Sequence, residues 1–237
     1  MKSRDGCVEV SRRELALGGL VLAGLLAARG AAIAADPGAA EKAGPAAADV
    51  LANLMEGNRR FMDGQPRMRA LTARRSALAA GQQPHVVVLA CSDSRLSPEL
   101  IFDHDLGDLF IVRVAGNVTD TIALGSIEYA VDHFPVKVLV VLGHEKCGAV
   151  AAAASGEKAH SPNIAALLKK IEPALAPLRS RASGEELVRL GVEANVHQSA
   201  RDMLEQSPLL RRATESGKVM LVKGLYRLAS GEVVRLG

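Results

Sequence analysis

The sequence predicts an α/β fold with a mainly parallel central β-sheet flanked by helices. Four short apolar runs carry this prediction, because each is continuous rather than alternating, as in strands buried on both faces of a sheet. Segments with helical periodicity lie between the runs, and this alternation of strands and helices is typical of α/β proteins. The predicted strands span residues 86–90, 109–114, 138–142 and 219–222.

Length and composition limit the class of protein. A chain of 237 residues, with 49% hydrophobic and 23% charged residues, is long and apolar enough for one globular domain plus a detachable terminal segment. This composition excludes a disordered chain, a collagen-like repeat and a small disulfide-rich scaffold. Only 3% of the residues are aromatic and none is Trp, so binding of nucleic acid by base stacking is disfavoured.

Residues 1–34 have the features of an export signal peptide. Arg12 and Arg13 precede an uncharged stretch at 15–28, and the small residues Ala32 and Ala34 follow, as in a signal-peptide cleavage site. Residues 11–17 resemble a twin-arginine signal in particular. Fourteen apolar residues rise only about 21 Å as a helix, less than the roughly 30 Å hydrocarbon core of a bilayer. We therefore expect cleavage after Ala34, a periplasmic protein, and no stable membrane span after the leader is removed.

The charge of the chain argues against a nucleic-acid or membrane-surface partner. The formal net charge is +3, but five of the 29 basic residues lie in the first thirty positions, together with three acidic ones. The remainder is nearly neutral and offers no basic footprint for a polyanion.

The order of elements predicts one folded domain after the leader. Residues 35–48 are rich in Ala, Gly and Pro and predict a flexible lead-in, so the domain is expected to span 49–237. Apolar residues then recur at helical spacing over 51–62, before breaks at Gly64 and Pro66. Further helices are predicted to begin at Ser97-Pro98-Glu99 and to span 122–134 and about 185–205.

Potential metal ligands follow two of the predicted strands. Cys91 comes directly after 86–90, and His144 and Cys147 follow 138–142. Because sites in open α/β sheets form at the carboxyl ends of strands, these side chains can converge. Two thiolates and one imidazole suit tetrahedral Zn²⁺ and leave one position open, as in catalytic zinc sites. The alternative is a disulfide, because Cys91 and Cys147 are the two cysteines that remain after the leader, with Cys7, is lost.

Asp93 and Arg95 follow Cys91 at intervals of two residues. Side chains two residues apart point to the same side of extended chain, so this spacing puts a carboxylate and a guanidinium beside the metal. Arg95 is expected to hold Asp93 ionised in a bidentate pair, and Asp93 to orient the attacking group. A surface ion pair is the alternative for an arbitrary Asp-x-Arg.

Several motifs, in order, resemble the β-class carbonic anhydrases. They are Cys-Ser-Asp-Ser-Arg-Leu-Ser-Pro-Glu at 91–99, Gly-Asp-Leu-Phe-Ile-Val-Arg-Val-Ala-Gly-Asn at 107–117, Gly-His-Glu-Lys-Cys-Gly-Ala-Val at 143–150 and Val-Lys-Gly-Leu-Tyr at 222–226. The likeness runs from about Leu51 to the C-terminus. It implies a β-carbonic anhydrase-like fold whose N-terminal helices pack on a partner subunit, and a homodimer or homotetramer. It also implies one Zn²⁺ per chain, held by Cys91, His144 and Cys147, and reversible hydration of CO₂ to bicarbonate and a proton by zinc-bound hydroxide.

The resemblance assigns roles to further residues. Gln82 matches a glutamine that donates a hydrogen bond to substrate, although neighbouring Gln83 would take this role after a one-residue shift. An apolar pocket wall, completed across a dimer interface, is assigned to Phe110, Val114 and Tyr129. The proton shuttle candidate is His133. An ordinary loop glutamine, core packing and a helix-end histidine are the respective alternatives.

In some family members the aspartate matching Asp93 moves onto zinc as a fourth ligand and closes the site. Members that do this carry a tryptophan three positions before the first cysteine, as part of a regulatory bicarbonate pocket. That position is Val88 here, so we expect no such pocket and an open site near neutral pH, with closure by Asp93 as a fourth metal ligand without that pocket as the alternative.

Two other functions are alternatives to CO₂ hydration. The same scaffold and metal would support hydrolysis of carbonyl sulfide or carbon disulfide, which are also small linear heterocumulenes. A non-catalytic zinc-binding or redox protein is the third reading. The presence of both Asp93 and Arg95 argues against it, because a closed structural site does not need that pair.

Overall fold

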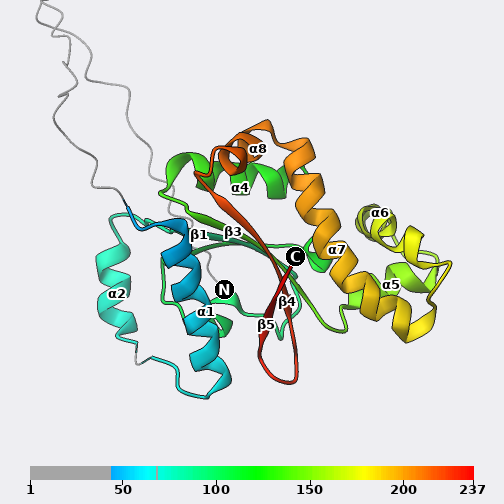
Figure 1. The fold of residues 1–237 in the computed structure, drawn as a ribbon, viewed down its shortest axis with the longest axis horizontal. Coiled ribbons are helices and arrows are strands. Elements are labelled where there is room, and N and C mark those ends of the chain that lie inside the picture. Colours follow the sequence, from blue (N-terminus) through cyan, green and yellow to red (C-terminus); the bar gives the residue numbers. More distant parts are fainter. Residues whose placement is uncertain (1–43, 68) are drawn as a thin grey trace, which may run out of the picture. The chain divides into compact units, whose positions relative to one another are not determined.

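The computed structural model describes residues 44–67 and 69–237, so the predicted leader (1–34) and most of the lead-in (35–48) lie outside the described residues. A five-stranded sheet in the order β2-β1-β3-β4-β5 forms the centre (Figure 1). All neighbouring pairs are parallel except β4 and β5, which confirms the predicted α/β fold with a mainly parallel sheet. The strands are β1 (Val86–Ala90), β2 (Leu109–Arg113), β3 (Val138–His144), β4 (Met220–Tyr226) and β5 (Val233–Leu236).

Two strands extend beyond the predicted apolar runs. β3 continues through Gly143 to His144, and β4 continues through Lys223 and Gly224 to Tyr226. The parallel ladder between them pairs His144 with Tyr226. Main-chain hydrogen bonds therefore extend both strands beyond the apolar residues from which they were predicted. β5 was not predicted, and it adds an antiparallel edge to β4.

The helices cover both faces of the sheet (Figure 1). The predicted helices at 51–62, 97–99, 122–134 and 185–205 are present as α1, α3, α4 and α7. The short helices α2, α5 and α8 were not predicted, nor was α6. The bounds are α1 (Ala47–Met62), α2 (Leu71–Leu78), α3 (Pro98–Ile101), α4 (Thr121–His133), α5 (Gly148–Ser155), α6 (Pro162–Leu175), α7 (Gly184–Gln206) and α8 (Pro208–Glu215), with 3₁₀ turns η1 (Ala115–Asn117) and η2 (Ala176–Leu178).

Helix α1 begins at Ala47, within the segment expected to be lead-in, because Ala47 and Ala48 are good helix formers that extend the helix backwards from Asp49. It is fixed to its own chain by the buried side chain of Asn58. The Asn58 Nδ2 donates to the carbonyls of Ile101 (3.1 Å) and Gly231 (2.8 Å), and its Oδ1 accepts from the Val233 N–H (2.9 Å). In contrast, α2 has no buried residue.

Alternate residues of the central strands supply two separate cores. Val86, Val88 and Ala90 of β1 face a core shared with α1, α3, α5 and α6, and this core includes Cys91 and Cys147. Val87 and Leu89 face the opposite core, which is built with α4, α8 and the second half of α7. This two-sided burial is the physical reason why the strands read as continuous apolar runs.

None of the helices within the described part of the chain is both long and apolar enough to cross a membrane.

Candidate metal centre

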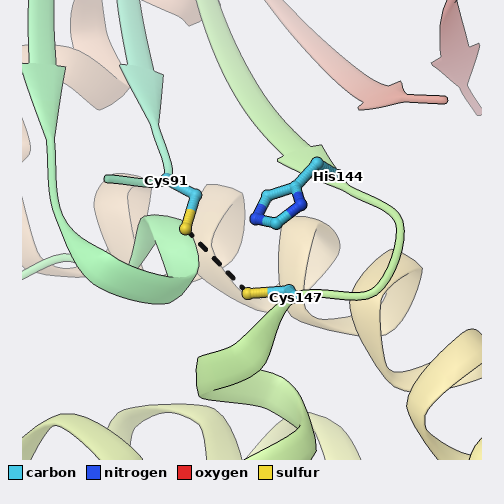
Figure 2. Close-up of side chains that lie close together, drawn as sticks. All are labelled: Cys91, His144 and Cys147. Carbon is cyan, nitrogen blue, oxygen red and sulfur yellow. Dashed lines mark hydrogen bonds between the residues drawn. The ribbon is translucent and has the colours of Figure 1, made fainter. Parts of the chain in front are cut away.

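Three metal-ligating side chains meet at the carboxyl edge of the sheet (Figure 2). Cys91 follows the end of β1, His144 ends the neighbouring strand β3, and Cys147 lies directly before α5. Their ligand atoms all lie within 4.8 Å of one another, and the two sulfurs are 3.9 Å apart. All three residues are buried, and both cysteines are free thiols. We call these three residues the metal cluster.

His144 is oriented for a metal by its main-chain neighbour. Its Nδ1 lies 2.8 Å from the carbonyl oxygen of Glu145, and because a carbonyl only accepts, Nδ1 carries the proton. The other ring nitrogen, Nε2, is therefore the one with a free lone pair. It is buried and has no hydrogen-bond partner within the described residues. A buried acceptor without a partner beside two thiols fits a bound cation, which would satisfy it.

The sulfur of Cys91 is stabilised as a thiolate. Its hydrogen bond with Cys147 is the largest cause that lowers the pKa of Cys91, and contacts with His144 and the Gly116 N–H (3.2 Å) add to it, although burial acts in the opposite direction. The same Cys91 thiolate, together with burial, raises the pKa of Cys147. The N–H groups of Ala149 and Val150 at the start of α5 act in the opposite direction. A divalent cation between the sulfurs would favour both thiolates.

Asp93 and Arg95 form the bidentate pair expected from their spacing. The Arg95 Nε donates to Asp93 Oδ1 (2.9 Å), its Nη2 donates to Oδ2 (2.8 Å), and its main-chain N–H also donates to Oδ1 (3.0 Å). These bonds hold the pKa of the Asp93 carboxyl well below its usual range, although burial acts in the opposite direction. Asp93 Oδ2 lies 3.8 Å from His144 Nε2, so the carboxylate borders the metal cluster.

The donor set and its surroundings indicate a catalytic rather than a structural metal site. Two sulfurs and one imidazole nitrogen suit Zn²⁺, and three protein ligands leave one coordination position for a reactant. A structural zinc is normally closed by four protein ligands. The Asp93 carboxylate borders the three ligands, 3.8 Å from His144 Nε2, and its ion pair with Arg95 holds it in place.

Of the predicted pocket residues, Val114 is the one that lies beside the metal cluster. Its N–H donates to the carbonyl of Ala90, the residue before Cys91, and its side chain packs against the core that contains both cysteines. Within this chain, the structure therefore brings Asp93, Arg95 and Val114 to the metal cluster. The other predicted site residues, which are Gln82, Phe110, Tyr129 and His133, lie elsewhere.

Phe110, Tyr129 and His133 lie together elsewhere, on the face of the sheet covered by α4. Tyr129 stacks on His133 with ring centroids 4.2 Å apart, and Phe134 lies 5.8 Å from Tyr129 and 6.0 Å from Phe110. Phe110 and Phe134 pack against the core opposite to the one that contains Cys91. We call these four residues the aromatic group. Tyr129 and His133 are half exposed, so they face solvent or a partner rather than this chain's own metal cluster.

Gln82 is also separated from the metal cluster. It lies exposed in the segment that precedes β1, whereas Cys91 follows the opposite end of that strand. A strand of five residues is about 16 Å long at 3.3 Å per residue, so Gln82 does not border the cluster of its own chain. Gln83 is in the same position.

The structure adds a supporting pair that sequence reasoning did not find. Asn195 of α7 is buried, and its Nδ2 donates to the carbonyl of Gly116 (2.6 Å), whose N–H in turn donates to the Cys91 sulfur. Gly116 has a φ of 69°, and an added Cβ would lie 2.8 Å from Ile171. Nothing in the sequence points to Asn195, because 79 residues separate it from Gly116.

Comparisons with known proteins agree with this geometry. A family profile described as carbonic anhydrase matches residues 86–233, which is more than half of the chain. Carbonic anhydrase 2 of Mycobacterium tuberculosis is 38% identical over 185 residues, covering 76% of this chain and 88% of the relative. The β-carbonic anhydrase CafA of Aspergillus fumigatus is similar in structure, with a TM-score of 0.60, 30% identity and coverage of 80% of this chain and 89% of that chain.

A further solved structure extends the likeness to an assembled enzyme. It belongs to the tetrameric β-carbonic anhydrases of the ascomycete Sordaria macrospora, with a TM-score of 0.63 and 25% identity over 80% of this chain and 95% of that chain. The fold, the buried Cys-His-Cys cluster and these similarities together lead to one conclusion. The chain belongs to the β-class of the carbonic anhydrase family.

Proposed function

We propose that this protein catalyses the reversible hydration of CO₂ to bicarbonate and a proton, with one Zn²⁺ per chain held by Cys91, His144 and Cys147. The observation that carries the proposal is the unpartnered, buried His144 Nε2 beside two thiols and the Asp93 carboxylate, in a chain of this family. When bound, Zn²⁺ supplies a Lewis acid that lowers the pKa of water enough to provide a nucleophile at neutral pH.

The hydrogen bonds of Asp93 define what its carboxylate does. An ionised carboxylate offers about four lone-pair sites. Arg95 uses two of them on Oδ1 and one on Oδ2, so the remaining acceptor site is on Oδ2, the oxygen that faces His144. Asp93 Oδ2 therefore accepts one hydrogen bond from the attacking group and orients it toward CO₂. Arg95 keeps the carboxylate from rotating away.

We also propose that the active site is completed by a second subunit. β2 is an edge strand, and the neighbouring exposed apolar side chains include Ile122 and Tyr129 of α4. In a homodimer or homotetramer, the aromatic group and Gln82 of one subunit would form the apolar wall and the polar contact for CO₂ beside the metal cluster of the other. His133, exposed in the same group, would then carry the released proton to buffer.

The location of the protein is part of the proposal. Residues 1–34 are proposed to direct export through a twin-arginine pathway to the periplasm, with cleavage after Ala34. Fractionation of cells that express the full chain tests this, with Arg12→Lys and Arg13→Lys together as the variant. We expect the variant to remain in the cytoplasm, and equal export of both chains would refute the assignment.

The decisive experiment for the function is stopped-flow CO₂ hydration with zinc content measured on the same sample. Activity with about one zinc per chain supports the proposal. Zinc without CO₂ hydration would instead favour hydrolysis of carbonyl sulfide or carbon disulfide, and both substrates are then tested with the same sample. If the protein has neither zinc nor activity, and Cys91 and Cys147 form a disulfide, it would instead be a redox protein.

A further inference from the structure

Arg113, the last residue of the edge strand β2, contacts the chain that carries the first metal ligand. Its Nε donates to the carbonyl of Cys91 (3.1 Å), and its Nη2 donates to the carbonyl of Asp93 (2.6 Å). The main-chain ladder between β1 and β2 ends just before, with the Val114 N–H on the Ala90 carbonyl (3.0 Å). The Arg113 guanidinium thus continues the hydrogen bonding between these two segments beyond the last main-chain bond of the ladder.

These contacts are the main interactions of the Arg113 side chain in the described chain. Arg113 forms no ion pair with any described residue, unlike Arg95, which pairs with a carboxylate. Its two N–H groups instead hold two carbonyls that are two residues apart, a span that suits the planar fork of a guanidinium and not the single point of an ammonium group. The side chain is placed to fix backbone, not to neutralise charge.

Asp93 is consequently held at two points by two arginines. Arg95 binds its carboxylate, and Arg113 binds its carbonyl. A fixed carbonyl holds the peptide plane that follows Asp93 and so restricts where its Cα lies, while Arg95 controls the orientation of the side chain. Without the Arg113 contact, the ion pair could move as a unit and take Oδ2 away from its place 3.8 Å from His144 Nε2.

We propose that Arg113 is a positioning residue that acts through Asp93, a role that rests on the proposed function. It sets where the Asp93 carboxylate stands relative to the metal cluster, and it is not needed to hold the metal, because all three ligands keep their own supports. Arg113→Ala is therefore expected to retain about one zinc per chain and to lower kcat about tenfold, with little change in KM. Arg113→Lys should restore part of this loss.

A double-substitution cycle separates this role from a merely structural one. If Arg113 acts through Asp93, Arg113→Ala should change kcat less than about twofold in a chain that already carries Asp93→Asn. Arg235→Ala is the matched control, because Arg235 is an exposed arginine on the opposite edge strand β5. It should leave zinc content and kcat unchanged in either background.

A readout without turnover keeps the test independent of the substrate. In the Co²⁺-loaded protein, Arg113→Ala should change the visible absorption bands when Asp93 is present and leave them unchanged in the Asp93→Asn chain. If the wild-type chain fails to hydrate CO₂ but this spectral pattern appears, the proposed function fails and the positioning role stands. Equal effects in both backgrounds, or loss of zinc and of cooperative unfolding in both Arg113 variants, would overturn the proposal.

Discussion

The metal cluster and the aromatic group differ in what holds their members together. Cys91, His144 and Cys147 are buried at the ends of two hydrogen-bonded strands, and each has a support from its own chain. Tyr129 and His133 lie half exposed on the opposite side of the sheet and stack mainly on each other. The cluster is therefore complete in one subunit, whereas the aromatic group has a surface that remains to be covered.

This difference shows which kind of residue a single fold can position. Parallel neighbours in register bring their carboxyl ends to the same edge, so ligands that follow two such strands must meet. A pocket wall for a small apolar substrate needs side chains from more than one direction. In this chain, part of the predicted wall, the aromatic group, lies on the face of the sheet opposite to the metal cluster. Substitutions in the two regions are thus expected to fail in different ways.

The largest effect is expected from Cys147→Ser. Removing one of two thiolates from a three-ligand site should abolish stable zinc binding and reduce CO₂ hydration to the uncatalysed rate. Zinc content by atomic absorption, followed by stopped-flow assays, checks this. Retention of one zinc per chain with full activity would mean that Cys147 is not a ligand. Cys7→Ser, in the full chain, should change neither quantity.

Asp93→Asn should separate catalysis from metal binding within the same region. The amide keeps the shape of the side chain but loses the charge that pairs with Arg95 and the acceptor site that faces His144. We expect zinc content to be unchanged and kcat to fall about 100-fold. Full activity in this variant would show that Asp93 has only a structural role.

Tyr129→Glu tests the aromatic group. If this surface is buried between subunits, an unpaired carboxylate there costs about 3 kcal/mol, which weakens association about 100-fold. Analytical ultracentrifugation should show smaller species, with zinc retained in each chain and activity reduced at low protein concentration. An unchanged assembly with unchanged activity would place the subunit contact elsewhere. Lys169→Glu, an exchange on α6, is the control.

Gly116→Ala tests the support of the Cys91 sulfur. The left-handed φ of 69° and the 2.8 Å approach to Ile171 both oppose a side chain, so the turn should shift at a cost of about 2 kcal/mol. The Gly116 N–H would then move away from Cys91, and we expect zinc affinity to fall about tenfold. Thermal unfolding and competition with a chelator measure the two quantities. Gly125→Ala, inside α4 and with nothing within 4 Å of the added Cβ, should leave zinc affinity unchanged and should not lower the unfolding temperature, because Ala favours a helix interior.

His133→Ala is expected to have the smallest effect. A proton carrier contributes only when buffer cannot reach the site directly, so kcat should fall less than about tenfold in dilute buffer and recover with added imidazole. His160→Ala, at another exposed histidine, is the matched control. A loss that imidazole does not restore would assign His133 to packing within the aromatic group.

Local pattern was enough for the four parallel strands and for the residues of the metal cluster. Continuous apolar runs marked β1 and β3, and the residues that follow them contained Cys91, His144 and Cys147, because strand direction alone determines where these side chains emerge. The family resemblance came from the same short motifs. Short or Ala-rich helices such as α2 and α5 gave no apolar stripe, and β5 was missed because its edge position follows from pairing with β4.

Tertiary structure alone decided the contacts between distant segments. It placed Phe110 and Tyr129 on the face opposite to Cys91, joined Asn195 to Gly116, and brought the Arg113 guanidinium over the chain that carries Asp93. Each of these contacts depends on which elements lie side by side and on where a side chain points across them. Sequence periodicity records only whether a residue is buried or exposed. It marked the strand ends that carry Cys91 and His144, and it left the side chains that support the metal cluster to the fold.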